Sequence, residues 1–166
     1  MKKNKLMIIY GFSFLFLGLD QFIKFLVINN LNILEEIPVI SNFFKIIYVE
    51  NKGAAFGILD GNTTILAIIS VIAFIFLTKY LKRETNISKI ATCSYILLIG
   101  GLMGNLLDRI VHHAVIDYLS FNFWSISFPI FNLADIGIVS GLLLLIMELM
   151  KGDTHEYIES NERRTH

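Results

Sequence analysis

Four long apolar runs, separated by polar segments, dominate the pattern of the sequence. They cover residues 6–28, 64–81, 90–107 and 131–150. A helix of about 20 residues crosses the hydrocarbon core of a bilayer, so runs of this length predict four transmembrane helices. We therefore expect one integral membrane domain over residues 1–150. The charged segment 151–166 has few apolar residues and is predicted to be a disordered tail.

The first apolar run begins like a secretory signal peptide, because Lys2, Lys3 and Lys5 precede it. No small-x-small cleavage site follows, which predicts that the run is retained as a transmembrane helix. Asp20 and Lys24 lie four positions apart in this run, so on a helix they share a face and can pair. The pair has two interpretations: an ion pair that fixes helix packing, or direct support of an active site.

The two longer connections, at 29–62 and 110–130, contain strand-like pieces rich in aromatic and β-branched residues. These pieces are residues 44–49, 115–116 and 121–128. Trp124, the single tryptophan, suits the headgroup level of a membrane. The glycines of the segment 50–57 permit a hairpin turn, and Asn51 would begin its loop. The two connections are therefore expected to contain strand-like segments.

The basic residues predict the orientation of the chain in the membrane. The N-terminus and the 79–89 connection together carry seven of them: Lys2, Lys3, Lys5, Lys79, Lys82, Arg83 and Lys89. The connection at 29–62 carries only Lys45 and Lys52. The positive-inside rule places both termini in the cytoplasm and the two longer connections outside.

Composition excludes several classes of protein and of site. The chain is 55% hydrophobic and 17% charged, against about 25% charged in an average soluble domain. Its formal net charge of zero gives no case for a nucleic-acid partner. The single Cys93 forms no internal disulfide or cysteine-based metal cluster and is read as an inert apolar residue. His112 and His113 are adjacent and match no zinc motif, so no metal or cofactor is predicted.

Strong polar groups gather on the third apolar run, where an ionisable residue is costly. Gly101, Gly104, Asn105 and Asp108 fall on one helix face. The glycines are explained by close packing against another helix. Asn105, Asp108 and Arg109 exceed what packing requires, so they are candidates for a functional site.

Two further acids have environments that favour opposite protonation states. Asn132 can cap a helix and Asp135 then lies at its third position, where the helix dipole stabilises a negative charge. Asp117 lies among apolar residues, where desolvation favours the protonated carboxyl. Acid–base hydrolysis of an amide needs such a pair: one group activates water, and the other assists the carbonyl oxygen.

The chain from Asp20 to about Met150 resembles the lipoprotein signal peptidases, the type II signal peptidases of bacteria. The matching pieces are Asp20-Gln21-x-x-Lys24, Asn51-x-Gly53-Ala54-Ala55-Phe56, Gly104-Asn105-x-x-Asp108-Arg109, Val115-x-Asp117-Tyr118 and Phe131-Asn132-x-Ala134-Asp135. The resemblance implies a mainly α membrane protein with four transmembrane helices and a small extracytoplasmic β-sheet cradle. It implies an aspartic endopeptidase that needs no cofactor. Such an enzyme removes the signal peptide of a prolipoprotein just before a diacylglyceryl-modified cysteine, at the outer face of the cytoplasmic membrane.

Motif position implies that Asp117 and Asp135 are the catalytic pair. The residues implied to bind substrate or support the pair are Asp20, Lys24, Asn51, Gly53, Asn105, Asp108, Arg109 and Asn132. The implied partners are lipid-modified prolipoproteins and membrane lipid, and the expected state is a monomer. The chain departs from the family pattern at Glu50, where arginine is frequent, and at Tyr118, where phenylalanine is common.

Two alternatives come from other classes of protein. A small transporter could line a polar path with these charged residues, but its polar groups should then spread through the depth of the membrane. Here most of them cluster toward one side. A scaffold held by glycine packing would not need two outer acids with capping partners.

Overall fold

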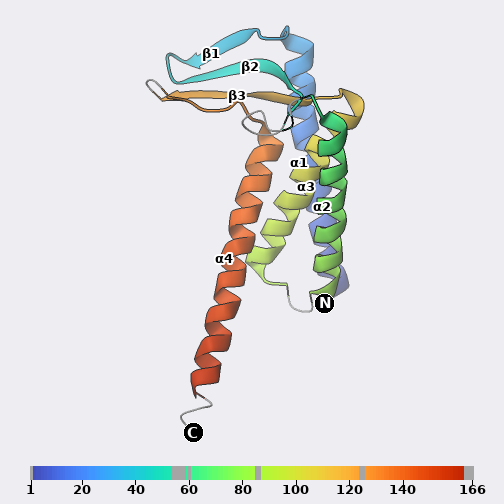
Figure 1. Cartoon of the computed structure of the whole chain (residues 1–166), viewed down its shortest axis with the longest axis vertical. Helices are drawn as coiled ribbons and strands as arrows, with labels where there is room; N and C mark the ends of the chain where they lie inside the picture. The colour runs from blue at the N-terminus through green and yellow to red at the C-terminus, as the bar shows by residue number, and fades with distance from the viewer. Residues whose placement is uncertain (1, 54–58, 60, 85–86, 124–125, 163–166) are drawn as a thin grey trace.

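The computed structural model describes residues 2–53, 59, 61–84, 87–123 and 126–162 of the chain. Three parts of the sequence interpretation fall outside these ranges: residues 54–57 after Gly53, Trp124, and the last residues of the predicted tail, 163–166. The described part consists of four helices and a small antiparallel sheet (Figure 1).

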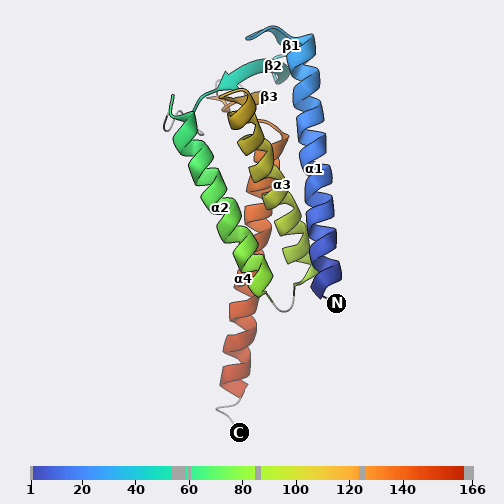
Figure 2. The same ribbon diagram turned by 90° about the vertical axis from the view of Figure 1, so that its right-hand side faces the viewer.

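The helices run alongside one another as a bundle (Figure 2). They are α1 (Lys2–Asn30), α2 (Thr63–Arg83), α3 (Lys89–Val111) and α4 (Leu133–Glu162). Each contains a segment long and apolar enough to cross a membrane: Lys3–Asn30, Thr63–Arg83, Lys89–Val111 and Leu133–Lys151. The predicted four-helix membrane architecture is therefore confirmed. The family prediction of a small sheet beside it is confirmed as well.

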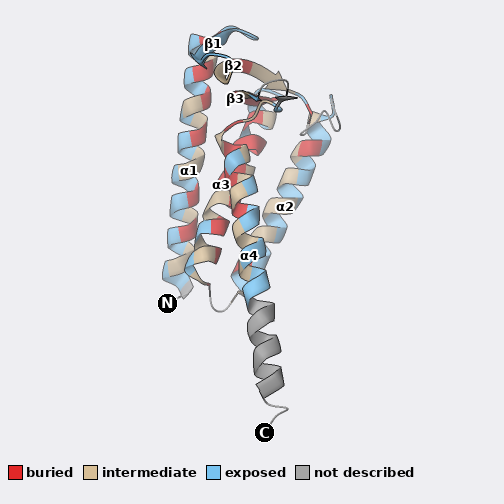
Figure 3. Ribbon diagram, turned by 90° about the vertical axis from the view of Figure 1, so that its left-hand side faces the viewer, coloured by how far each residue is buried: buried red, intermediate tan, exposed pale blue. Residues whose placement is uncertain are grey.

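Helix α3 lies at the centre and packs against the other three helices (Figure 3). It carries most of the buried positions of the bundle, whereas α1, α2 and α4 turn large apolar side chains outward. Phe14 on α1 is 73% exposed and Phe76 on α2 is 72% exposed. Such an apolar exterior suits a helix bundle whose solvent is lipid.

Glycines allow α3 and α4 to approach closely. A Cβ at Gly101 would lie 2.5 Å from the carbonyl oxygen of Ala134, and one at Gly141 would lie 3.0 Å from that of Ser94. The Ser94 hydroxyl donates a hydrogen bond of 2.7 Å to the Gly141 carbonyl across the same interface. The predicted role of the glycines in helix packing is confirmed.

The sheet crosses one end of the bundle, opposite the N-terminus (Figure 1). Its strands are β1 (Glu36–Ile40), β2 (Phe44–Asn51), β3 (Val115–Phe123) and the short β4 (Ile126–Ser127), in the order β1-β2-β3-β4. All the pairs are antiparallel, and Val49 of β2 lies opposite Asp117 of β3. Pairing with β2 thus sets the position of Asp117.

The structure differs from the sequence interpretation at two elements. Strand β1 lies outside the strand-like pieces expected from the sequence. It contains Pro38, which has no backbone donor, and an edge strand tolerates this loss. Helix α4 continues to Glu162, whereas the span was expected to end near 150 and a disordered tail to follow. No proline interrupts residues 151–162, and extending a helix that already exists costs little. The boundary between a membrane domain at 1–150 and a tail stays a prediction.

Replacing Gly101 by alanine should destabilise the fold. The new Cβ would meet the backbone of α4, and overpacking of this kind costs about 1–3 kcal/mol. Gly18→Ala on α1 is the matched control, because nothing lies within 4 Å of a Cβ there. Thermal unfolding in detergent should show a lower midpoint for Gly101→Ala and an equal or higher one for Gly18→Ala. Equal midpoints for Gly101→Ala and the wild type would contradict the close-packing account.

Candidate active site

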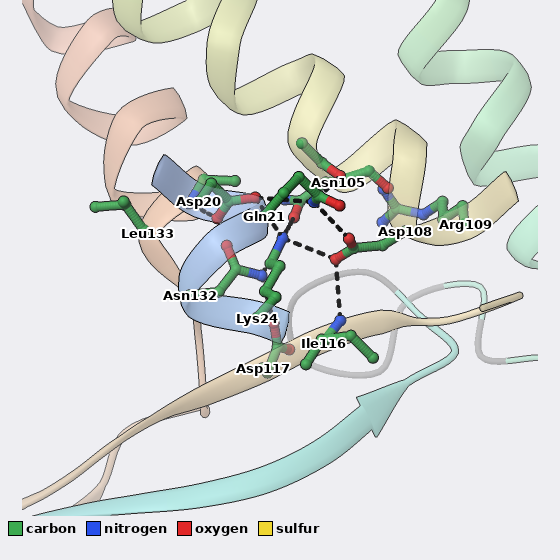
Figure 4. A network of polar contacts seen from close by, with 12 residues as sticks. Asp20, Gln21, Lys24, Asn105, Asp108, Arg109, Ile116, Asp117, Asn132 and Leu133 are labelled. Carbon is green, nitrogen blue, oxygen red and sulfur yellow. Dashed lines mark hydrogen bonds and ion pairs between the residues drawn. The ribbon is translucent and has the colours of Figure 1, made fainter. Parts of the chain in front are cut away.

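Helices α1, α3 and α4 and strands β2 and β3 each send polar side chains to the region where the sheet meets the bundle (Figure 4). Most of these side chains are buried. Each polar group must therefore find partners within the protein, since an unpaired buried polar group is costly. The contacts fall into three groups, around the start of α4, around Asp117, and around Lys24.

Helix α4 begins with a reciprocal cap that fixes Asp135. The Asn132 side-chain oxygen accepts a hydrogen bond from the Asp135 backbone N–H at 2.9 Å. The Asn132 backbone N–H donates to Asp135 Oδ2 at 3.2 Å in return. This is the capping-box arrangement, so the predicted helix start at Asn132 is confirmed. Asp135 Oδ1 accepts a hydrogen bond of 2.7 Å from the Asn105 amide on α3.

Asp117 on β3 is 2% exposed and has a donor for each carboxylate oxygen. Asn132 Nδ2 donates to Oδ1 at 2.7 Å, and Asn51 Nδ2 donates to Oδ2 at 2.8 Å. Asn51 is oriented in turn by the Gly53 backbone N–H, which donates to its side-chain oxygen at 2.9 Å. This is the Asn-initiated loop expected from the sequence. The expected hairpin is wrong, because the next described element after β2 is helix α2 and not a strand.

Burial raises the pKa of Asp117 from its ordinary value to about 7, and the negative charge of Asp135 acts in the same direction. The hydrogen bonds from Asn51 and Asn132 and the charge of Lys24 oppose this rise in pKa. Desolvation is the largest cause, so Asp117 retains a proton at a pH where a solvated aspartate has lost it. The Asn132 side-chain amide donates to the Asp117 carboxyl and the Asn132 backbone N–H donates to the Asp135 carboxyl, so one residue joins the two acids.

A buried ion cluster lies behind the two acids and contains Asp20, Lys24 and Asp108. Their side chains are 0%, 2% and 1% exposed. Lys24 Nζ lies 2.9 Å from Asp20 Oδ2 and 2.7 Å from Asp108 Oδ2. The predicted pairing of Asp20 with Lys24 is confirmed, and Asp108 extends it from α1 to a second helix, α3.

Both carboxylates of the cluster also accept hydrogen bonds from backbone groups of the site. Asp20 Oδ1 accepts from the Ala134 N–H of α4 at 3.0 Å, and Asp108 Oδ2 accepts from the Ile116 N–H of β3 at 3.1 Å. Buried ions need such additional hydrogen bonds to offset the cost of desolvation. The cluster therefore ties α1 and α3 to the two elements that carry the acids.

Arg109 has one buried donor that no described residue uses. Its Nη1 donates to the Asn105 carbonyl at 3.2 Å, whereas its buried Nε has no hydrogen-bond partner among the described groups. A buried donor without a partner is uncommon in a folded protein. Because Arg109 also lines a cavity, its guanidinium group is a candidate to bind a ligand there.

A cavity of about 910 Å³ opens beside both acids. Its polar lining includes Asn51, Asn105, Arg109, Asp117 and Asp135. Its apolar lining comes from 128–131 before α4 and from 136, 138 and 139 on α4 itself. A concave site with a few convergent polar groups and an apolar wall is typical of a substrate pocket.

The structure brings all the predicted site residues to this end of the molecule, whereas their chemical roles stay predictions. The sequence interpretation did not assign a role to Gln21, which donates to Asp108 Oδ1 at 2.8 Å and to Asp20 Oδ2 at 3.2 Å. It also did not assign one to Tyr118, whose hydroxyl accepts from the Leu133 N–H at 3.2 Å. The only signal for either residue was its place beside an acid in a motif. Among the described residues, no group of three His, Cys, Asp or Glu could hold a metal ion.

A family model described as signal peptidase (SPase) II matches residues 12–151. The chain belongs to the signal peptidase II family. It is similar to the lipoprotein signal peptidase of Halothermothrix orenii, with 45% identity over 131 residues, which are 79% of this chain and 87% of the relative. It is also 32% identical over 155 residues to the lipoprotein signal peptidase of Halalkalibacterium halodurans, covering 93% of this chain and 99% of that one.

Two solved structures share the fold. One is described as a bacterial membrane enzyme determined by the in meso method at 2.3 Å resolution. It has a TM-score of 0.81 and 29% identity, and the match covers 92% of this chain and 91% of that one. The other carries the same description at 1.9 Å, with a TM-score of 0.76, 30% identity and coverage of 90% and 94%. Family membership makes the chain a multi-pass membrane peptidase of the aspartic type, so the transporter alternative is not supported.

The effect of Asp117 on stability should depend on pH. Its pKa is raised from 3.8 to about 7 in the folded protein. Between these values the folded state holds a proton that the unfolded state has released, so this residue's contribution to stability falls as pH rises. Asp117→Asn removes this pH-dependent loss of stability, because asparagine does not titrate. The free energy of unfolding of the variant relative to wild type should rise by up to about 4 kcal/mol between pH 4 and 7.

Chemical denaturation at several pH values measures this difference. Glu36→Gln is the control, because that carboxyl is exposed on β1 and pairs only with Lys45 among the contacts described for it. Its stability difference from wild type should stay nearly flat over the same range. A flat difference for Asp117→Asn would mean that Asp117 is ionised in the folded protein throughout.

Proposed function

We propose that Asp117 and Asp135 are the catalytic dyad of an enzyme that removes signal peptides from prolipoproteins. The observation that carries this proposal is the placement of both carboxyls beside one cavity, joined through Asn132. The names of the two relatives, both lipoprotein signal peptidases, support prolipoproteins as the substrate class. The bond cut is the one before a diacylglyceryl-modified cysteine.

The reaction divides acid and base work between the two carboxyls. Asp135 accepts hydrogen bonds from Asn105 and from the backbone at the start of α4, which favours its ionised form. It takes a proton from water as the water oxygen adds to the scissile carbonyl carbon. Asp117 gives its proton to the carbonyl oxygen, which completes a tetrahedral diol.

Collapse of the diol returns both carboxyls to their starting states. The carbon–nitrogen bond breaks, and the leaving amine takes the proton that Asp135 had gained. One diol hydroxyl returns its proton to Asp117 as the new carboxyl group forms. The two acids act as one titrating unit, since each changes its protonation state twice in a cycle.

The other lining residues are assigned to the substrate. Arg109 lines the cavity and would bind a backbone carbonyl near the cleaved bond. The apolar wall along α4, at Ile136 and Val139, would lie against the acyl chains of the modified cysteine. Both side chains are exposed on the outside of the bundle, where lipid would surround them. The groups that form the site come from one chain, which supports action as a monomer.

The proposed orientation has both termini in the cytoplasm and the dyad near the outer face of the cytoplasmic membrane. The basic residues support it. Lys82 and Arg83 end α2, and Lys89 begins α3, at the end of the bundle opposite the sheet (Figure 2). The positive-inside rule assigns that end to the cytoplasm.

Either Asp117→Asn or Asp135→Asn should reduce kcat by about 10³-fold or more, and the double variant should be little worse, because the two residues act as a unit. The fold should survive, since asparagine is similar in shape and costs less to bury. The measurement is cleavage of a diacylglyceryl-modified precursor peptide by variants purified from membranes. Glu36→Gln should cleave at the wild-type rate.

Robust cleavage by one single variant would remove that residue from the dyad. Robust cleavage by the double variant would contradict the proposed aspartic mechanism. An unlipidated precursor in the same assay tests the substrate assignment, because its cleavage at the rate of the lipidated precursor would contradict recognition of the lipid.

Reporter fusions test the orientation. A fusion at Lys82 should report the cytoplasm, and a fusion at Lys45 in β2 should report the outside, because the sheet and the basic connection lie at opposite ends of the bundle. A cytoplasmic signal from Lys45 would contradict the proposed topology.

A further inference from the structure

Lys24 has a contact that an ion pair does not require. Besides the two carboxylates, its ammonium group donates a hydrogen bond of 3.1 Å to Asn105 Oδ1. Figure 4 shows the Lys24 side chain reaching from α1 to the middle of the polar network. The side chain is 2% exposed and is not among the residues that line the cavity. None of the hydrogen bonds described for Lys24 therefore reaches Asp117 or Asp135; it contacts the dyad through other side chains, and its charge acts on Asp117 in the direction that lowers the pKa of that carboxyl.

The contact fixes which way the Asn105 amide points. An amide side chain has an oxygen that accepts and a nitrogen that donates. The Asn105 oxygen accepts from Lys24 and, at 3.2 Å, from Asn132 Nδ2. Its nitrogen is consequently turned toward Asp135 Oδ1, at 2.7 Å. The reversed amide would place a donor against the ammonium group and an oxygen against a carboxylate, and both contacts would be repulsive.

We propose that Lys24 is a positioning residue that acts through Asn105 to keep Asp135 ionised and the shared proton on Asp117. The proposal rests on the dyad proposed above and adds the residue that decides where its proton resides. A donor held toward a carboxylate favours the charged form. Without Lys24 the Asn105 amide is free to reverse, and Asp135 loses that donor.

Several charges surround the dyad and must be separated in a test. Asp20 and Asp108 lie beside Lys24, so this cluster carries a formal charge of −1. Arg109 on α3 interacts electrostatically with Asp135, Asp108 and Asp117. Removing Lys24 alone changes both the amide contact and the charge of the cluster. Lys24→Met combined with Asp108→Asn keeps the formal charge at −1 and removes the contact.

The experiment measures kcat and KM across pH with a lipidated precursor peptide. Lys24→Met and the charge-balanced double variant should both lower kcat by at least about tenfold and leave KM within about twofold, because Lys24 does not line the cavity. The acid limb of the kcat profile should move to higher pH by about one unit in both, since the dyad then loses a donor that stabilises its negative charge. Lys24→Arg keeps a cation at this position and should retain more activity than Lys24→Met.

Gln21→Met is the matched control. Gln21 donates to the same two acids as Lys24, and none of its described hydrogen bonds reaches Asn105. This variant should lower the thermal midpoint and leave the acid limb at its wild-type pH. If the acid limb shifts as far in Gln21→Met as in Lys24→Met, the effect comes from any disruption of the buried cluster and not from the contact with Asn105. That result would contradict the proposal.

The proposal is also overturned if the acid limb stays at its wild-type pH in Lys24→Met and in the charge-balanced double variant. It is likewise overturned if the acid limb moves in Lys24→Met but lies at the wild-type pH in the double variant. Failure of both to accumulate in membranes would assign Lys24 to folding and would overturn it too. Asp117→Asn and Asp135→Asn are assayed alongside. If they cleave normally, the dyad itself is wrong; if they are inactive while the Lys24 variants behave as wild type, only the role of Lys24 is wrong.

Discussion

Asn132 contacts both acids of the site, and the rest of the arrangement depends on it. Its side chain is fully buried, its oxygen accepts from the Asp135 N–H, and its nitrogen donates to Asp117 and to Asn105. Removing such a group leaves buried partners unsatisfied, at about 1–3 kcal/mol each. One residue therefore begins α4, holds the two acids at a common cavity and joins them to α3.

Buried charge explains why the site is surrounded by so many polar partners. The Asp20, Lys24 and Asp108 cluster is closed from solvent and carries a formal charge of −1, and the dyad adjoins it. Two further full negative charges in the same low-dielectric region would be costly. A proton on Asp117 removes one of them. The same desolvation that raises the pKa of Asp117 would thus supply the protonated acid of the proposed hydrolysis.

Structural features that depend on residues close together in the sequence were predictable from it. The spans follow from apolar length, the Asp20–Lys24 pair from helical spacing, and the cap at Asn132 from residue type and position. Contacts between distant segments were not predictable in this way. The family resemblance named Asn51 as a supporting residue, but only the register of β2 against β3 places its amide on Asp117. The bridge from Gln21 to Asp108 likewise needs the packing of α1 on α3.

The most direct test of the account is a carboxyl-carbon NMR titration of the enzyme labelled at aspartate, with Asp117→Asn and Asp135→Asn used for assignment. The account predicts that one carboxyl of the pair stays protonated near neutral pH. That carboxyl should titrate at about pH 7, and replacing its partner should change its midpoint. If both carboxyls are fully ionised at pH 5, the shared proton does not exist and the proposed mechanism is contradicted.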